Sequence, residues 1–276
     1  MIKLVAIDMD GTLLDSRKEL PDENRDTIEE YAKKGIMFAF CTGRVMNEIQ
    51  LIWDQLPSVN YAVTCNGSLV YDISDRKQFR QIHGDTLTME EVRDIYKFID
   101  KLGYPMMFEL QADGVVYAEK ESIDHPEWYE IEYIRELLKE TRVPVQNMKS
   151  YIYERTEDVG KINIFFPNMQ IRNQVLEQLK VLDYDLAYSE PTNLDINKKG
   201  SNKGRGLEKL MKHLKLTSRE VLAIGDNFND IELLQTTPNS VAMGNAPQEI
   251  KDCANYITKS NDESGVAYAI KKFCSL

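Results

Sequence analysis

The stretch VAIDMDGTLLDS, residues 5–16, decides which fold this sequence predicts. It continues an apolar run from Leu4 to Ile7, of the kind that forms a strand buried on both faces of a parallel sheet. The run ends in two carboxylates, Asp8 and Asp10, followed by a glycine that favours a turn. Desolvating a carboxylate costs several kcal/mol unless a positive charge lies beside it. We therefore expect a positively charged group at the end of this strand.

Apolar strands and amphipathic helices alternate after this opening. Two further strands, at 36–41 and 61–65, contain few polar residues, and helices are predicted within 20–35 and around Ile49. The same alternation resumes from Lys203 to the end of the chain. This order is typical of an α/β fold, and it predicts a Rossmann-like core with a parallel sheet covered by helices on both faces.

The middle of the chain has a different character. A helix is predicted from residue 89, with a capping box formed by Thr88 and Glu91, and Asp113 with Gly114 marks a hairpin turn between two strands. The stretch PEWYEIEYIRELLKE, 126–140, predicts one further helix. We therefore expect an α+β module inserted into the core. The expected boundaries are 83–192 for the module and 1–82 with 193–276 for the core.

The charge balance limits the possible partners. Acidic residues outnumber basic ones by 45 to 34, a net charge of -11, which disfavours nucleic acids and anionic membranes. No apolar run approaches the roughly 18 residues of a membrane span, and the first residues lead directly into a strand, so we expect a cytoplasmic protein. The four cysteines lack CxxC spacing and are expected to be reduced. We expect a monomer or a weak homo-oligomer.

Four acidic residues are expected to meet at one edge of the core sheet. Besides the opening pair, the motif GDNFND at 225–230 follows a buried strand. The carboxyl ends of parallel strands lie at the same edge, where α/β proteins bind their ligands. Carboxylates gathered there repel one another unless they share a divalent cation, and oxygen ligands suit Mg2+. The expected metal site comprises Asp8, Asp10, Asp226 and Asp230.

Groups suited to a phosphoryl oxygen follow two other elements of the core. Thr42 offers a hydroxyl, Gly43 and Arg44 offer amides at the start of a helix, and Lys203 offers an ammonium group at the start of another. Such donors and cations cradle phosphate groups in proteins. With Lys203 and Mg2+ neutralising the phosphate, a nearby carboxylate can attack phosphorus. Asp8 is the candidate nucleophile, and Asp10 lies close enough in sequence to transfer the proton.

The motifs DMDGT, CTGR, NKG and GDNFND, in that order, resemble the four motifs of the haloacid dehalogenase (HAD) superfamily. The stretch VAMGNAPQEIKDCANYITKSNDESGVAYAI is similar to the C-terminal part of its Cof-type phosphatases. The resemblance covers about residues 1–82 and 190–276. The inserted module matches the large α/β (C2-type) cap of that family in placement and size.

The resemblance implies a role for each motif residue. Asp8 would form an aspartyl-phosphate and Asp10 would act as general acid and base, while Thr42 would bind the phosphoryl group and Lys203 would bridge it to Asp8. The Asp8 carboxylate, the Asp10 carbonyl and the Asp226 carboxylate would hold Mg2+. Asp230 would support this metal site from behind. Four residues would contact the phosphate or line its pocket: Asn229, Gly43, Arg44 and Asn66.

These observations predict a Mg2+-dependent phosphatase of small phosphorylated metabolites, with sugar phosphates as one candidate class. A phosphomutase is an alternative, although the superfamily's mutases usually carry a small helical cap after the first motif. A receiver-like regulatory module that holds a phosphoaspartate is a second alternative, although it needs neither a proton donor at Asp10 nor an inserted module. No pattern within 83–192 identifies the metabolite.

Overall fold

The chain forms two compact units in a computed structural model that describes residues 1–188 and 190–274. The first unit corresponds to the predicted core and the second to the predicted inserted module. The first comprises Met1–Arg44, Ile49–Gly84 and Ser201–Leu276, and the second comprises Val45–Glu48 and Asp85–Gly200.

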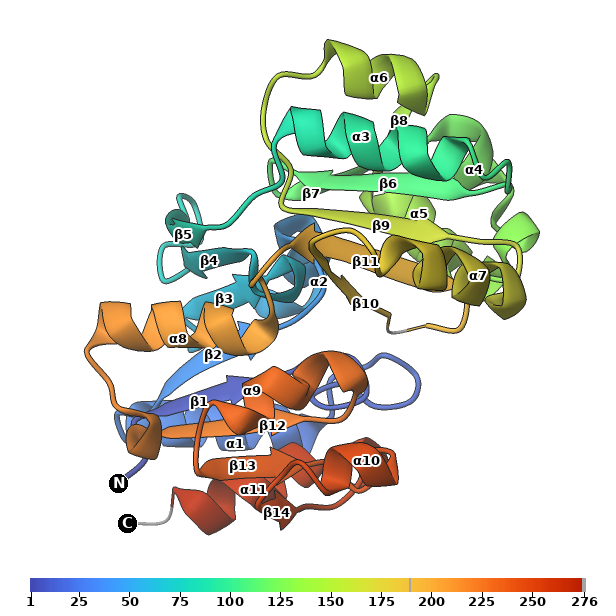
Figure 1. The fold of residues 1–276 in the computed structure, drawn as a ribbon. Coiled ribbons are helices and arrows are strands. Elements are labelled where there is room, and N and C mark those ends of the chain that lie inside the picture. The colour runs from blue at the N-terminus through green and yellow to red at the C-terminus, as the bar shows by residue number, and fades with distance from the viewer. Residues whose placement is uncertain (189, 275–276) are drawn as a thin grey trace. The chain divides into compact units, whose positions relative to one another are not determined.

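The first unit is built on an eight-stranded sheet with the order β14-β13-β12-β1-β2-β3-β4-β5 (Figure 1). The strands from β14 to β3 are parallel to their neighbours, and β4 and β5 extend the sheet in antiparallel fashion. Because β1 lies in the middle of the sheet, the acidic residues that follow it lie at the middle of the sheet edge. The strands are β1 (Leu4–Ile7), β2 (Met37–Cys41), β3 (Tyr61–Thr64), β4 (Leu69–Asp72), β5 (Arg80–Gly84), β12 (Val221–Gly225), β13 (Asn239–Ala242) and β14 (Tyr256–Ile257).

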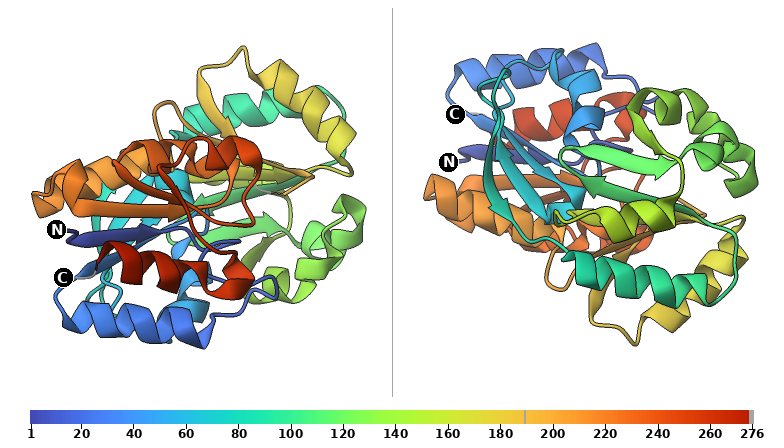
Figure 2. Two further views of the ribbon diagram at one scale, coloured as in Figure 1. Left: turned by 90° about the horizontal axis from the view of Figure 1, so that it is seen from below. Right: turned by 90° about the horizontal axis from the view of Figure 1, so that it is seen from above.

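Helices cover both faces of this sheet (Figure 2). On one face, Leu207 and Leu210 of α8 pack against buried residues of β1 and β2 such as Leu4 and Ala39. On the other face, α1 and α11 lie side by side. The Rossmann-like α/β core predicted from the alternation of elements is thus confirmed. The helices are α1 (Asp22–Lys33), α2 (Met46–Trp53), α8 (Lys203–Leu214), α9 (Ile231–Gln235), α10 (Gln248–Lys251) and α11 (Gly265–Phe273).

The second unit contains a six-stranded sheet with the order β10-β11-β9-β6-β7-β8. Apolar side chains of α3, α6 and α7 pack against one face of it, including Ile95, Ile152 and Val175. The strands are β6 (Met107–Ala112), β7 (Val115–Glu119), β8 (Arg142–Val145), β9 (Lys161–Phe165), β10 (Tyr184–Ala187) and β11 (Asn193–Lys198). The helices are α3 (Met89–Asp100), α4 (Lys120–Asp124), α5 (Arg135–Thr141), α6 (Met148–Glu154) and α7 (Met169–Leu179).

Two local predictions in this unit are confirmed. Thr88 caps α3, because its side chain accepts a hydrogen bond from the Glu91 backbone while the Glu91 carboxylate binds the Thr88 backbone. Asp113 and Gly114, with φ of 57° and 78°, form the turn between β6 and β7, which pair in antiparallel fashion. Two residues that tolerate positive φ thus form the turn that sets the register of this hairpin.

The predicted helix at 126–140 is wrong. Two 3-10 turns, Pro126–Tyr129 and Glu132–Ile134, precede the shorter α5, and Glu130 between them adopts a left-handed conformation with φ of 57°. Tyr129 and Ile131 are both buried in one apolar cluster, which a continuous helix would place about 200° apart on its surface. Burial of both side chains therefore breaks the helix.

The second unit also ends later than the expected residue 192. The strand Asn193–Lys198 pairs with β9 on one side and β10 on the other, so its backbone hydrogen bonds tie it to the sheet of this unit. The unit accordingly continues to Gly200 and also takes in Val45–Glu48. Within the described parts of the chain, no helix has the length and apolar character needed to cross a membrane.

Candidate active site

The turn after β1 places Asp8 at the edge of the sheet. Its backbone amide donates to the Ile224 carbonyl of β12 at 3.0 Å, and its side chain is buried. Gly11 in the same turn has φ of 81°, and a Cβ there would lie 2.4 Å from the Asp226 carboxylate. Only a glycine therefore allows the two acidic loops to approach this closely.

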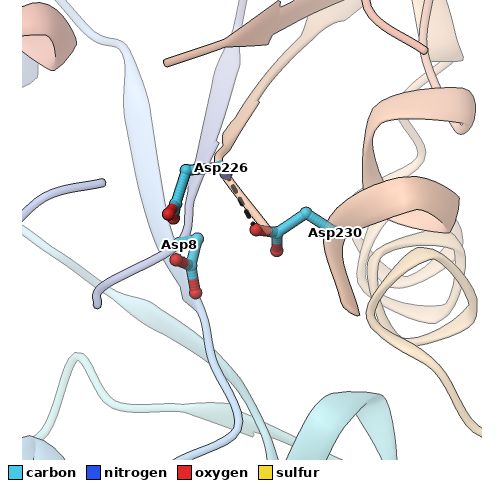
Figure 3. Close-up of side chains that lie close together, drawn as sticks. All are labelled: Asp8, Asp226 and Asp230. Atoms are coloured by element: carbon cyan, nitrogen blue, oxygen red, sulfur yellow. Dashed lines mark hydrogen bonds between the residues drawn. The ribbon is translucent and has the colours of Figure 1, made fainter. Parts of the chain in front are cut away.

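Asp8, Asp226 and Asp230 bring their carboxylates together at this edge (Figure 3). One oxygen of each lies within 4.8 Å of the others. Burial and the Asp230 carboxylate raise the pKa of Asp8 well above its ordinary value, and the same causes raise the pKa of Asp226 to about 6. Crowded oxygen ligands with raised pKa values are the donor set that a divalent cation stabilises in the ionised form. The residues thus fit Mg2+.

Lys203 supplies a positive charge within this cluster. Its Nζ donates to Asp8 Oδ1 and to Asp230 Oδ1, both at 2.7 Å, and the residue is fully buried. Although burial lowers the pKa of Lys203, the two carboxylates raise it more, so the ammonium form is held well above its ordinary range. The lysine begins α8, whose first turn is fixed by the Asn202 side chain accepting from the Arg205 backbone at 2.9 Å.

Asp230 differs from the other two acids, because its oxygens are already engaged. Oδ1 accepts from Lys203, while Oδ2 accepts from the backbone amides of Asp226 and Asn227 at 2.9 and 3.0 Å. A Cβ at Gly225 would lie 2.6 Å from the Asp230 carboxyl carbon, so the chain passes directly over this side chain. Asp230 therefore positions the Asp226 loop and Lys203.

Thr12 is a site residue that sequence reasoning missed. Its Oγ1 donates to Asp226 Oδ1 at 2.7 Å, which orients the carboxylate that lies next to Asp8. The signal was present, since Thr12 is the last residue of the DMDGT motif. Lys18 was also missed, and no local pattern distinguished it from other surface lysines.

Asp10 is held by two basic side chains. Arg44 binds it through both oxygens, with Nε 2.8 Å from Oδ2 and Nη2 2.7 Å from Oδ1, and Lys18 Nζ lies 3.0 Å from Oδ1. Burial alone would raise the pKa of Asp10, but Arg44 and Lys18 together lower it far below its ordinary value. The structure thus places the Arg44 guanidinium on Asp10, whereas the sequence suggested the phosphate pocket for it.

The other predicted phosphate ligands lie in one connected group. Thr42 is buried, its Oγ1 accepts from the Arg44 amide at 3.1 Å, and its carbonyl accepts from the Asn66 amide at 3.1 Å. Asn229 Nδ2 donates to Asn66 Oδ1 at 3.3 Å. Gly43 lies in the loop between Thr42 and Arg44. The predicted site residues therefore lie in the loops, two 3-10 turns and one helix start at this sheet edge.

Comparison with known protein families identifies the family to which this chain belongs. The sequence model of the haloacid dehalogenase-like hydrolases matches residues 5–270. The chain belongs to this family. The resemblance of its four motifs is thus confirmed, as is the expectation of a phosphatase-type enzyme of the HAD superfamily.

The HAD-like hydrolase has relatives along its whole length. It is 31% identical to the 5-amino-6-(5-phospho-D-ribitylamino)uracil phosphatase YcsE of Bacillus subtilis, over 98% of this chain and 95% of that protein. It is 26% identical to the pyridoxal phosphate phosphatase YbhA of Escherichia coli, over 97% of each. Among solved structures, a haloacid dehalogenase-like hydrolase from B. subtilis matches with a TM-score of 0.86 and 26% identity, over 98% of this chain and 99% of that one.

Proposed function

We propose that this enzyme is a Mg2+-dependent phosphatase that hydrolyses small phosphorylated metabolites through an aspartyl-phosphate on Asp8. The observation that carries the proposal is the position of Asp8, buried between the Lys203 ammonium at 2.7 Å and the Asp226 carboxylate. A nucleophile needs a nearby cation when it attacks an anionic phosphate. In this proposal, the carboxylates of Asp8 and Asp226 and the Asp10 carbonyl would hold Mg2+, which would neutralise charge on the phosphoryl oxygens.

The reaction proceeds in two displacements. In the first, a carboxylate oxygen of Asp8 forms a bond to phosphorus, the bond from phosphorus to the leaving oxygen breaks, and Asp10 gives that oxygen a proton. In the second, water attacks the aspartyl-phosphate, Asp10 takes the proton of the water, and the bond between phosphorus and Asp8 breaks. Lys203 stays beside the Asp8 oxygens throughout, while Thr42 and Asn229 donate to the phosphoryl group.

The ion pair of Asp10 fits one of these two steps directly. Arg44 and Lys18 hold Asp10 as a carboxylate, which is the form that accepts a proton from water. To give a proton to the leaving group, Asp10 must first be protonated and must release one oxygen from Arg44. The hydrogen bonds from Arg44 therefore determine whether Asp10 can act as the acid or as the base.

We expect the Asp10→Asn variant to lose activity in a way that depends on the leaving group. A poor leaving group such as a sugar alkoxide needs a proton, whereas p-nitrophenolate leaves without one. The first displacement should therefore slow by about 100-fold or more for a sugar phosphate and much less for p-nitrophenyl phosphate. Burst kinetics measure this displacement separately from hydrolysis. Equal losses for both leaving groups would contradict the assignment of Asp10 as the acid.

The second unit is proposed to act as the cap that selects the organic part of the substrate. The relatives support small organic monophosphates, since the names of YcsE and YbhA specify a phosphorylated ribitylamino compound and pyridoxal phosphate. The net charge of -11 argues against long polyanions as substrates. All four cysteines are free, which supports a reducing compartment, and we place the enzyme in the cytoplasm.

Phosphate release from p-nitrophenyl phosphate and from a panel of sugar and polyol phosphates tests the proposed function. The purified protein with Mg2+ should release phosphate from several of them. Acid quenching during turnover should trap labelled phosphate on Asp8, which mass spectrometry locates. If folded protein releases phosphate from none of these compounds, the proposed function is wrong.

A further inference from the structure

The chain passes from the first unit to the second at the peptide bond between Arg44 and Val45. Arg44 is the residue whose guanidinium binds both oxygens of Asp10. The next four residues, Val45–Glu48, belong to the second unit, and the chain returns to the first unit at Ile49. We call Val45–Glu48 the linking segment. The side chain that holds Asp10 is thus joined directly to a segment of the other unit.

Three interactions hold the linking segment within the second unit. The Asn47 amide donates to the Gly114 carbonyl at 2.9 Å, and Asn47 Nδ2 donates to the Thr141 carbonyl at 2.7 Å. In the third interaction, Glu48 Oε1 accepts from Arg142 Nη1 at 2.5 Å. These partners belong to the β6–β7 turn, the end of α5 and the start of β8. The linking segment is therefore fixed by residues that are distant in sequence.

The Glu48 carboxylate uses both of its oxygens. While Oε1 pairs with Arg142, Oε2 accepts from the Val45 amide at 3.2 Å. Val45 directly precedes α2, and Glu48 is the third residue of that helix, so this hydrogen bond is one half of a capping box. The apolar side chain of Val45 cannot supply the other half. Glu48 thus connects the Arg142 guanidinium to the backbone amide next to Arg44.

Burial of this ion pair indicates a role beyond capping. The side chains of Glu48 and Arg142 are 7% and 5% exposed, and Arg142 Nε also donates to the buried Glu109 carboxylate at 2.8 Å. Capping does not require burial, because Glu91 caps α3 with 30% of its side chain exposed. A buried ion pair often contributes no more stability than apolar residues of similar volume. The position that Glu48 imposes therefore explains its burial better than stability does.

The peptide group between Arg44 and Val45 is bound on both sides. Its carbonyl accepts from the Cys65 amide at 3.1 Å, and its N–H is the one that the linking segment binds. The Arg44 amide is fixed as well, since it donates to Thr42 Oγ1 at 3.1 Å. A guanidinium that binds a carboxylate through two nitrogens depends on exact geometry. A shift of this planar peptide group would therefore weaken the contact of Arg44 with Asp10.

We propose that Glu48, anchored by Arg142, is a positioning residue that keeps the Arg44 guanidinium on Asp10, an inference that rests on the proposed phosphatase function. Glu48 acts through the backbone of Arg44 rather than on the substrate. The orientation of the Asp10 carboxylate matters most in the second displacement, when Asp10 takes the proton of the attacking water. Loss of this positioning therefore slows hydrolysis of the aspartyl-phosphate more than its formation.

Glu48→Gln tests the proposal with little change in size. Its amide has one oxygen in place of two, so it can satisfy Arg142 or the Val45 amide but not both. With p-nitrophenyl phosphate, whose leaving group needs no proton, formation of the aspartyl-phosphate should change by less than about twofold. Hydrolysis should slow by about tenfold. Release of p-nitrophenolate measures formation, and acid quenching in single-turnover experiments follows the decay of the labelled aspartyl-phosphate.

A double-mutant cycle shows whether Glu48 acts through Arg44. Arg44→Met cannot bind Asp10, so it should slow hydrolysis by itself. Addition of Glu48→Gln to Arg44→Met should then slow hydrolysis no further. Glu109→Gln is the matched control, because it removes the charge on the other side of Arg142 and leaves the pair with Glu48. Its Tm should fall, whereas its rate of hydrolysis should stay within about twofold of the wild type.

Four results would each overturn the proposal. They are an unchanged rate of hydrolysis in Glu48→Gln, an equal slowing of formation and hydrolysis, the same slowing when Arg44 is already replaced, and the same slowing in Glu109→Gln. If Glu48→Gln does not fold, Glu48→Asp replaces it, since its charge is kept but its shorter side chain cannot reach both partners. Failure of the proposed function is distinct, because then the wild type forms no aspartyl-phosphate.

Discussion

Replacing Asp8 by asparagine should lower kcat by at least about 10,000-fold, the largest loss that we expect from a single side chain. The amide is nearly the same size as the carboxylate, and its oxygen can still accept from Lys203, so the surroundings need not move. What the amide lacks is the nucleophilic oxygen that forms the bond to phosphorus. Phosphate release from p-nitrophenyl phosphate measures the loss, and mass spectrometry should find no phosphate on the variant.

The stability of the Asp8→Asn variant shows whether the loss of activity comes from the missing nucleophile or from unfolding. Because burial raises the pKa of Asp8, the folded state binds its proton more tightly than the unfolded state, and the wild type loses stability as pH rises above the ordinary value of 3.8. The asparagine does not titrate. Without added metal at neutral pH, the variant should therefore be at least as stable as the wild type. Asp26→Asn on the surface of α1 is the control. Retention of a tenth of the activity would rule out Asp8 as nucleophile.

Removal of divalent metal should abolish turnover, and Mg2+ should restore it. Three carboxylates with oxygens within 4.8 Å and one lysine leave an excess of negative charge, to which the substrate phosphate adds more. We expect EDTA to reduce kcat/KM to below about 1% of its value. Titration of Mg2+ after dialysis against the chelator measures the recovery. Full activity in EDTA would contradict the metal assignment.

The requirement for Mg2+ should also depend on pH. Asp226 has a pKa of about 6 because of burial and the nearby Asp230 carboxylate, so below pH 6 it carries a proton that Mg2+ must displace. The concentration of Mg2+ for half-maximal activity should therefore fall as pH rises from 5 to 7. Asp226→Asn should need more Mg2+ at every pH and should show a weaker dependence on pH.

The core and most of its site could be predicted because local patterns determine them. Strand and helix periods identify the parallel sheet, and the carboxyl ends of its strands bring residues from distant motifs to one edge. The patterns could not show which hydrogen bonds each carboxylate oxygen accepts. The residues of GDNFND alone do not distinguish Asp226 from Asp230, and only the resemblance to the family gave them different roles. In the structure, Asp230 is engaged by two backbone amides and a lysine. Arg44 has its partner, Asp10, in another loop, which only the tertiary fold brings near.

The inserted unit was less predictable for the same reason. In β9, the polar residues Lys161 and Asn163 alternate with Ile162 and Ile164, which indicates a strand with two different faces. The alternation does not show which helices pack on the apolar face, where Ile162 and Ile164 lie in one cluster with residues of α3, α6 and α7. The broken helix near Glu130 likewise depends on which side chains the tertiary fold buries. Periodicity reports the two faces of an element but not what covers each of them.

The central place of β1 has a consequence for how the chain acquires its activity. Leu4 lies opposite Val221, so the strand that carries Asp8 pairs with one that the ribosome makes only after the whole inserted unit. Asp85–Gly200 is nearly continuous in sequence and can fold as it emerges. The catalytic edge cannot, because it needs both ends of the chain. Contacts between such distant residues form slowly, so we expect assembly of this sheet to limit the rate of folding.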